Sequence, residues 1–163
     1  FIGPCIAKKS EVKDQQIEGN ADAVLTFSEI RAIMKAKGVV LTAEENSYQE
    51  ASVFGKRYGN SGGVTNAVLE YLKETDNEID AKVYRANGAA DCKKALLLMK
   101  VGRLPEDFIE GMACEGGCVG GPSAFQGEIA SKKNRDSLIS CADCRTIVEN
   151  LSKIDMGAFE HHR

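Results

Sequence analysis

Residues 81–114 read AKVYRANGAADCKKALLLMKVGRLPEDFIEGMAC, and this stretch decides the fold class. Residues 81–85 alternate between apolar and polar side chains, as a β-strand does, and residues 107–110 form a second short strand pattern. Between the two strands, Gly88 precedes a helical pattern over residues 89–99. A strand, a helix and a second strand in succession are typical of α/β proteins with a parallel sheet.

The remaining sequence continues this alternation of strands and helices. Strands are predicted at residues 1–4 and 23–27, and helices at about residues 28–37, 64–73 and within 136–153. Ser28 is expected to cap the helix that begins there, and Gly38 to end it. Residues 42–60 and 120–135 are predicted to be mostly loop. We therefore predict a single domain over residues 1–163, an α/β three-layer lobe with a mostly parallel sheet of about four strands flanked by helices.

The composition excludes two classes of partner. No apolar run approaches the roughly 18 residues that a membrane-spanning helix needs, so we expect no membrane partner. Lys and Arg total 21 against 24 Asp and Glu, which gives a formal net charge of −3, and Trp is absent. A mildly acidic chain with few aromatic side chains lacks the basic surface and stacking platforms of nucleic-acid binders, so we expect no nucleic-acid partner.

Six cysteines are a high count for a chain of this kind, and they fall into separate groups. They are Cys5, Cys92, Cys114, Cys118, Cys141 and Cys144. A chain with this much periodic helix does not need a disulfide framework, so we expect reduced thiols and a cytoplasmic location. In a reducing compartment, clustered thiols ligate metal or carry out redox chemistry.

Three of the cysteines are predicted to converge on one crevice. Cys5 follows one predicted strand, and Cys114 and Cys118 follow another, so parallel neighbouring strands would bring these thiols to the same sheet edge. Glycines at 116, 117, 120 and 121 leave room for a bulky inorganic group, and their amides could donate hydrogen bonds to its sulfur atoms. An iron–sulfur cluster needs four thiolates, and the fourth could be another cysteine of this chain or one from an upstream segment.

Two motifs give the chain a resemblance to a known family. Residues 4–11, PCIAKKSE, fit the pattern P-C-x-x-K-x-x-E, and residues 110–121, EGMACEGGCVGG, fit E-x-M-x-C-x-x-G-C-x-x-G. In this order, and about a hundred residues apart, they resemble the second and third signature motifs of the iron-only ([FeFe]) hydrogenase catalytic domain. The resemblance covers about residues 1–121.

The resemblance implies a two-part iron cofactor, a [4Fe-4S] cluster with a di-iron subcluster attached to it. By this match Cys5 and Cys114 are ligands of the [4Fe-4S] cubane, and Cys118 is the cysteine that bridges the two parts. Lys8 matches a lysine that hydrogen-bonds a cyanide ligand of the di-iron unit, and Glu11 matches a carboxylate in the proton path. Met112 matches the methionine that lines the di-iron pocket.

The family also has a first motif, a Thr-Ser-Cys-Cys-Pro run, which this sequence lacks. The chain begins with Phe1 rather than Met, so we expect that motif in an upstream lobe of the same protein, which would supply the fourth cubane ligand. On this interpretation, residues 1–163 are the C-terminal half, or second lobe, of the catalytic domain and are inactive alone. The implied partners are the upstream lobe and an electron carrier such as ferredoxin, and the implied reaction is reversible hydrogen oxidation.

Three alternatives stay open. Residues 122–125, PSAF, replace the family's usual Gly-Gln-Pro continuation, which favours a non-turnover redox or hydrogen sensor. A zinc-stabilised structural domain could instead use four thiolates, those of Cys114, Cys118, Cys141 and Cys144. Lys8 and Glu11 are three residues apart, so on a helix they could form a simple ion pair. The sequence assigns no role to the C-x2-C pair at 141 and 144, and Cys92 is expected to be structural.

Overall fold

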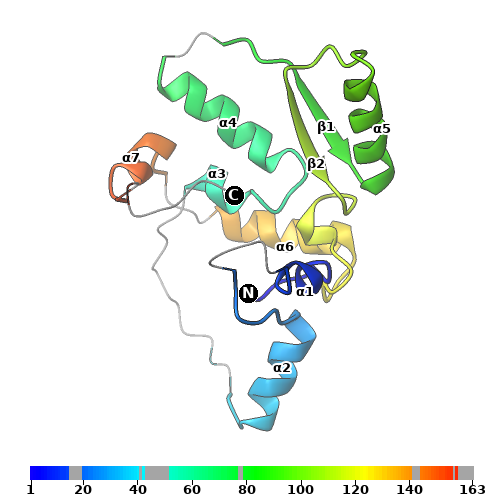
Figure 1. Ribbon diagram of the computed structural model, residues 1–163. Helices are drawn as coiled ribbons and strands as arrows, with labels where there is room; N and C mark the ends of the chain where they lie inside the picture. Colours follow the sequence, from blue (N-terminus) through cyan, green and yellow to red (C-terminus); the bar gives the residue numbers. More distant parts are fainter. Residues whose placement is uncertain are drawn as a thin grey trace.

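The computed structural model describes residues 1–14, 20–40, 42, 52–76, 79–140, 144–155 and 157. Its α-helices are α1 (Lys8–Glu11), α2 (Phe27–Ala36), α3 (Val53–Lys56), α4 (Gly63–Glu74), α5 (Ala89–Lys100), α6 (Glu128–Ser140) and α7 (Ile147–Leu151) (Figure 1). The strands are β1 (Val83–Asn87) and β2 (Phe108–Met112), and η1 (Cys118–Gly120) is a short 3-10 helix.

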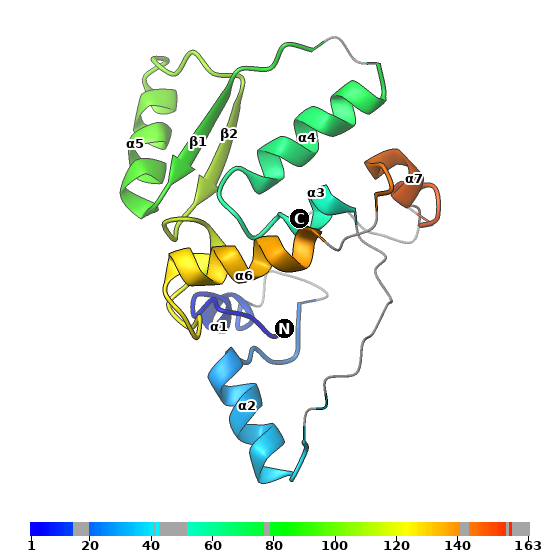
Figure 2. The ribbon, with the colours of Figure 1, turned by 180° about the vertical axis from the view of Figure 1, so that it is seen from behind.

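The stretch that decides the fold class forms a parallel β1–α5–β2 unit. Val83 pairs with Phe108 at one end of the sheet and Asn87 pairs with Met112 at the other. The two strands lie between α5 on one side and α4 on the other, an order that the view from behind also shows (Figure 2). The predicted α/β class is therefore confirmed.

The predicted count of about four strands is wrong for the described residues, which form a sheet of two strands. The segments predicted as strands at residues 1–4 and 23–27 meet in one isolated parallel bridge, between Ile2 and Leu25. Leu25 cannot extend this pairing, because Thr26 directly after it is already the cap of α2. Ile2 is also 54% exposed, so it is not the buried strand residue that the sequence predicted.

Two predicted helix boundaries also move. Thr26 rather than Ser28 caps α2, because the Thr26 N–H donates to Glu29 Oε2 at 2.7 Å while the Thr26 hydroxyl accepts from the Glu29 N–H. A hydrogen bond from Lys9, followed by the Thr26 bonds, lowers the pKa of Glu29 from 4.5 to about 2. Helix α6 begins at Glu128, inside the predicted loop 120–135. Its sparse apolar pattern, in which only Ile139 is buried, hid this start.

A buried carboxylate joins the sheet to α4. Glu110 is 5% exposed, and its side chain leaves β2 to meet the amino-terminal end of α4. Its two carboxylate oxygens accept hydrogen bonds from the N–H of Gly62 at 2.9 Å and from the N–H of Thr65 at 3.0 Å. The Thr65 hydroxyl also donates to Glu110, and Thr65 itself is fully buried. Gly62 has no side chain to cap the helix, so Glu110 supplies both the hydrogen-bond acceptor and the negative charge that this helix end favours.

The buried core is small, and large apolar side chains remain on the surface. The buried apolar residues are Val24, Ala67, Ala86, Ala95 and Ile139. By contrast, Ile129 and Leu138 on α6 are 86% and 72% exposed. None of the helices in the described ranges is long and apolar enough to cross a membrane.

Replacing Glu110 tests the cap of α4. Glu110→Gln keeps the shape of the side chain but replaces one of its two accepting oxygens by an NH2 group, which cannot accept a hydrogen bond from the backbone of α4. We therefore expect a loss of about 1–3 kcal/mol in the free energy of unfolding. Urea denaturation followed by circular dichroism measures it. The matched control is Glu70→Gln on the same helix, where a 3.6 Å pair with the largely exposed Lys73 predicts a change within about 0.5 kcal/mol. Equal losses in the two variants would contradict the cap.

Candidate metal centre

The two cysteines after β2 lie in a loop that only glycine permits. Gly116 and Gly117 have φ angles of +78° and +92°, a region that other residues rarely adopt. The Gly117 N–H donates to the Cys114 carbonyl at 3.1 Å, and the Gly121 N–H donates to the Cys118 carbonyl at 3.0 Å. We call residues 114–121 the cysteine loop. These turns hold both cysteines in a loop of fixed backbone.

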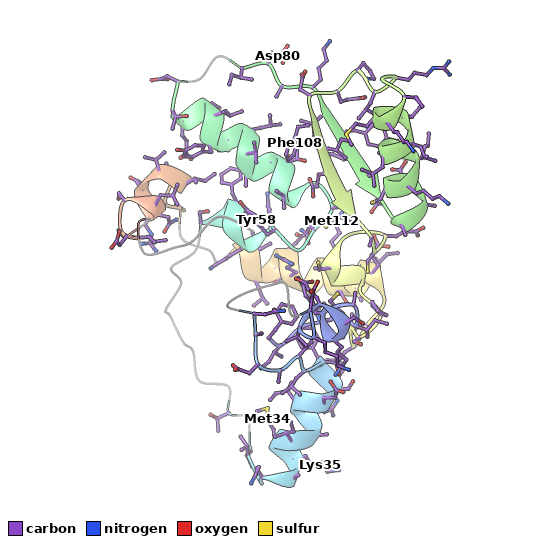
Figure 3. All side chains as sticks on the ribbon, viewed as in Figure 1. Met34, Lys35, Tyr58, Asp80, Phe108 and Met112 are labelled. Atoms are coloured by element: carbon purple, nitrogen blue, oxygen red, sulfur yellow. The ribbon has the colours of Figure 1, made fainter. Side chains whose placement is uncertain are left out.

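The carboxyl end of the sheet fixes the start of the cysteine loop. The Asn87 side-chain oxygen accepts a hydrogen bond from the Gly116 N–H at 2.8 Å, and the Gly88 N–H donates to the Met112 carbonyl at 2.7 Å. Asn87 is itself held from behind, because its N–H donates to Asp91 on α5 at 3.1 Å. This bond, with a second from the Tyr84 hydroxyl, lowers the pKa of Asp91. Figure 3 shows Met112 at the end of β2 next to the loop that leads to α6.

A second turn, at residues 59–61, holds the middle of the cysteine loop. The Ser61 N–H donates to the Gly116 carbonyl at 3.1 Å, and the Val119 N–H donates to the Gly59 carbonyl at 3.2 Å. The packing is close enough that a Cβ on Gly117 would lie 2.5 Å from both the Gly59 oxygen and the Ser61 nitrogen. Gly62, the next residue, is bound by Glu110, so the cap of α4 also places this turn.

The segment that carries Cys5 reaches the cysteine loop from the other end of the chain. The Ser123 N–H donates to the Pro4 carbonyl at 3.1 Å, and a Cβ on Gly121 would lie 2.8 Å from the same carbonyl oxygen. Contact between these two loops therefore brings Cys5, which follows Pro4, toward the loop that carries Cys114 and Cys118. The sequence predicted this convergence through neighbouring strands of one sheet, but Ile2 pairs with Leu25 and not with β2.

The Cys114 thiol responds to its burial and to the two other thiols. Burial raises the pKa of the Cys114 thiol, and the nearby charges of Cys5 and then Cys118 raise it further. Cys5 and Cys114 are half-buried, whereas Cys118 is exposed. Neighbouring thiolates without a cation repel one another, and a metal centre relieves that repulsion because its ligands bind deprotonated.

Thiolates from separate segments are the type of donor that an iron–sulfur cluster takes. A tetrahedral zinc site holds all its sulfur ligands about 2.3 Å from one ion, and within the described ranges no three Cys, His, Asp or Glu side chains are grouped closely enough to hold a metal ion. A cubane takes each thiolate on a different iron, so its ligands can stand farther apart. The zinc alternative gains no support here, and its ligand Cys141 lies outside the described residues.

Two further cysteines differ from these three in their contacts or exposure. The Cys92 Sγ packs 3.4 Å from the place where a Cβ on Gly111 would be, and 3.9 Å from the Ala86 carbonyl oxygen, between α5 and the sheet. This environment agrees with a structural role for Cys92. Cys144 is an exposed free thiol between α6 and α7.

The sequence model described as "Iron only hydrogenase large subunit, C-terminal domain" matches residues 1–122. The chain belongs to this family. It is 30% identical over 155 residues to the "Periplasmic [Fe] hydrogenase large subunit" of Nitratidesulfovibrio vulgaris, a match that covers 74% of this chain and 37% of that protein. It is 32% identical over 158 residues to "Iron hydrogenase 1" of Clostridium pasteurianum, a match that covers 74% of this chain and 27% of that protein. The chain thus spans well under half the length of these relatives.

Lys8 and Glu11, both in the hydrogenase motif at residues 4–11, pair with each other. Both lie on the one-turn helix α1 just after Cys5, and the Lys8 Nζ lies 2.7 and 2.6 Å from the two carboxylate oxygens of Glu11. Both side chains are about one-third exposed, at 39% and 32%. An ion pair at this exposure contributes little to stability. Met112, the sixth predicted site residue, is half-buried at the end of β2.

The residues that hold the cysteine loop in place were not among those predicted from the sequence. Asn87 binds the Gly116 N–H. Glu110, although part of the motif at residues 110–121, was not predicted to bind the N–H of Gly62. One signal was available for Glu110. Helix α4 begins at two glycines, 62 and 63, and neither has a side chain that could accept a hydrogen bond from the first backbone N–H groups of the helix. Another residue must therefore supply that acceptor.

Gly117→Ala tests whether the cysteine loop needs its glycine. Both the positive φ and the contact with residues 59–61 oppose a methyl group, so we expect a loss of about 1–3 kcal/mol in the free energy of unfolding. Gly127→Ala is the matched control, because a Cβ there meets nothing within 4 Å, and we expect a change within about 0.5 kcal/mol. Denaturant titrations of both variants measure the difference. A Gly117→Ala variant as stable as the parent would show that the loop is not held in this way.

Proposed function

We propose that this chain is the part of an iron-only hydrogenase catalytic domain in which Cys5 and Cys114 hold a [4Fe-4S] cubane and Cys118 holds the bridge to a di-iron subcluster. The observation that carries the proposal is the contact of the segment that holds Cys5 with the loop that holds Cys114 and Cys118, although the two lie about a hundred residues apart in the sequence. When bound, this cofactor supplies the reversible oxidation of dihydrogen to protons and electrons.

The surrounding residues support the cofactor in four ways. The N–H groups of the cysteine loop donate to oxygen atoms, and not to sulfur as predicted from the sequence, and so hold the backbone around Cys114 and Cys118 in place. Lys8, three residues after Cys5, would turn its ammonium from Glu11 toward an anionic ligand of the cofactor. The Glu11 carboxylate, paired with Lys8, is the group that we propose holds and passes on a proton. Met112 contributes an apolar wall at the end of β2.

The rest of the protein completes the site in this proposal. The two motifs offer three thiols where a cubane takes four, and we propose that the fourth ligand comes from an upstream lobe. The exposed apolar side chains around the site, such as Phe125 at 59% and Leu138 at 72%, are suited to be covered by that lobe. We also propose a cytoplasmic electron carrier of the ferredoxin type, although one of the relatives is named as periplasmic.

A sensor function is the second candidate, and the residues after the cysteine loop favour it. Where active relatives of the family would continue with Gly-Gln-Pro, this chain has Pro122 and Ser123, and the Ser123 N–H is used to bind the Pro4 carbonyl. The altered segment therefore ties the two motifs together. A sensor would load the same cluster and show no hydrogen evolution after full maturation.

Metal analysis tests the proposal. Two samples are prepared without oxygen, the 163-residue chain and a longer protein that includes the upstream lobe. Before the di-iron subcluster is inserted, we expect about four iron and four sulfide per longer protein and little in the chain alone. Cys5→Ser and Cys114→Ser should reduce the iron content severalfold, whereas Cys92→Ser, at a cysteine between α5 and the sheet, should not.

The opposite results are equally clear. One zinc per chain with no iron in either sample would mean that the thiols form a structural zinc site. Equal iron loss in Cys92→Ser and Cys114→Ser would remove the assignment of these particular ligands.

A further inference from the structure

A cavity of about 560 Å³ opens beside Cys118. It lies between α2, the cysteine loop and α6, and its lining includes Phe27, Val119, Phe125, Leu138 and one cationic side chain, Arg135. Uncharged polar side chains, those of Gln126, Ser131 and Asn134, also line the cavity, and Arg135 has no carboxylate beside it in this lining. Arg135 lies on α6, beyond residues 1–122 that match the hydrogenase family, so the match assigns it nothing.

Arg135 is held directly beside the cysteine loop. Its guanidinium lies against Gly59 so closely that a Cβ on Gly59 would collide with Nη1. The Gly59 carbonyl in turn accepts a hydrogen bond from the Val119 N–H at 3.2 Å, one residue after Cys118. Packing of α6 on η1 fixes the backbone on both sides of this contact. The position of the guanidinium relative to Cys118 is therefore set by the fold.

The charge of Arg135 is not neutralised within 4 Å by any carboxylate in the described ranges. The ion pairs found there involve Lys8, Lys9 and Lys73. Desolvation lowers the pKa of Arg135, while the charges of Cys118 and Asp136 act in the opposite direction. A guanidinium remains protonated at any physiological pH, so a fixed positive charge faces the Cys118 end of the cavity.

We infer that Arg135 is a positioning residue for Cys118. The positive charge of the Arg135 guanidinium attracts anionic groups to this end of the cavity, next to the Cys118 sulfur. The inference rests on the proposed function, in which Cys118 carries a cofactor with negatively charged ligands. There the guanidinium stabilises the added negative charge of the reduced cofactor and helps to orient the ligands next to Cys118.

The metal-free chain allows a test that does not depend on the cofactor. Iodoacetate and iodoacetamide alkylate the same thiolate with loss of iodide, but only iodoacetate is an anion. The rates of both reactions at Cys118 are measured by peptide mass spectrometry. Because both depend equally on the fraction of ionised thiol, the ratio of the iodoacetate rate to the iodoacetamide rate reports the electrostatic potential at Cys118. We expect Arg135→Gln to lower this ratio about three- to tenfold, and Arg135→Lys to retain most of it.

Two controls separate the field from a structural effect. Lys133→Gln removes a positive charge from an exposed position on the same helix and should leave the ratio unchanged. High salt should lower the parent ratio toward that of Arg135→Gln, because it screens charges at an exposed thiol. A parent ratio that is independent of salt, or an equal ratio in the parent and in Arg135→Gln, would overturn the inference.

A second readout links Arg135 to the cofactor. In the longer protein loaded with iron, Arg135→Gln should move the reduction potential of the cluster to more negative values in a titration followed by electron paramagnetic resonance, and Arg135→Lys should restore it. An unchanged reduction potential would show that Arg135 does not stabilise the reduced cofactor. If the longer protein takes up no iron, the proposed function fails, while the alkylation ratio still decides whether Arg135 creates the field.

Discussion

The carboxylate of Glu110 binds the amino-terminal end of α4, and the position of the cysteine loop depends on this interaction. Glu110 lies on β2, four residues before Cys114, so the same short strand carries both the cap and the loop. By accepting from the N–H of Gly62, Glu110 fixes the turn at residues 59–61, whose backbone then bonds to Gly116 and Val119. A charged acceptor buried with three donors is costly to disturb, so sheet, helix and loop hold one relative geometry.

The site lies at the carboxyl end of a parallel sheet, the usual place for function in α/β proteins, but the sheet alone does not assemble it. Only the cysteine loop follows a strand of the sheet. Cys5 arrives on a separate segment, held by the bond between Ser123 and Pro4 and by close packing on Gly121. Glycines at the points of contact allow the backbones to approach closely. The centre is thus built from loops that rest on a small rigid unit, and its exposed apolar surroundings suit a larger partner surface.

Periodicity predicted the β1–α5–β2 unit and α4 well, because in those segments apolar spacing and glycine boundaries agree. It failed where tertiary contacts decide. The bridge between Ile2 and Leu25 is cut short by the capping box of Thr26, and α6 carries too few buried apolar residues to show its start. The site cysteines came from motif spacing, which carries chemical information that periodicity lacks. Arg135 could not be found in this way, because its importance comes from a contact with Gly59 that is distant in sequence.

Cys5, Cys114 and Cys118 are expected to lie close together before any metal binds. A short bifunctional thiol reagent, applied to the reduced, metal-free chain and mapped by mass spectrometry, tests this most directly. Cross-links should form among these three cysteines, whereas Cys92, packed between α5 and the sheet, should not join them. Cross-links from Cys5 to Cys92 or Cys144 at the same yield as those to Cys114 would contradict the account, because the segments would then not be held together by the contacts described.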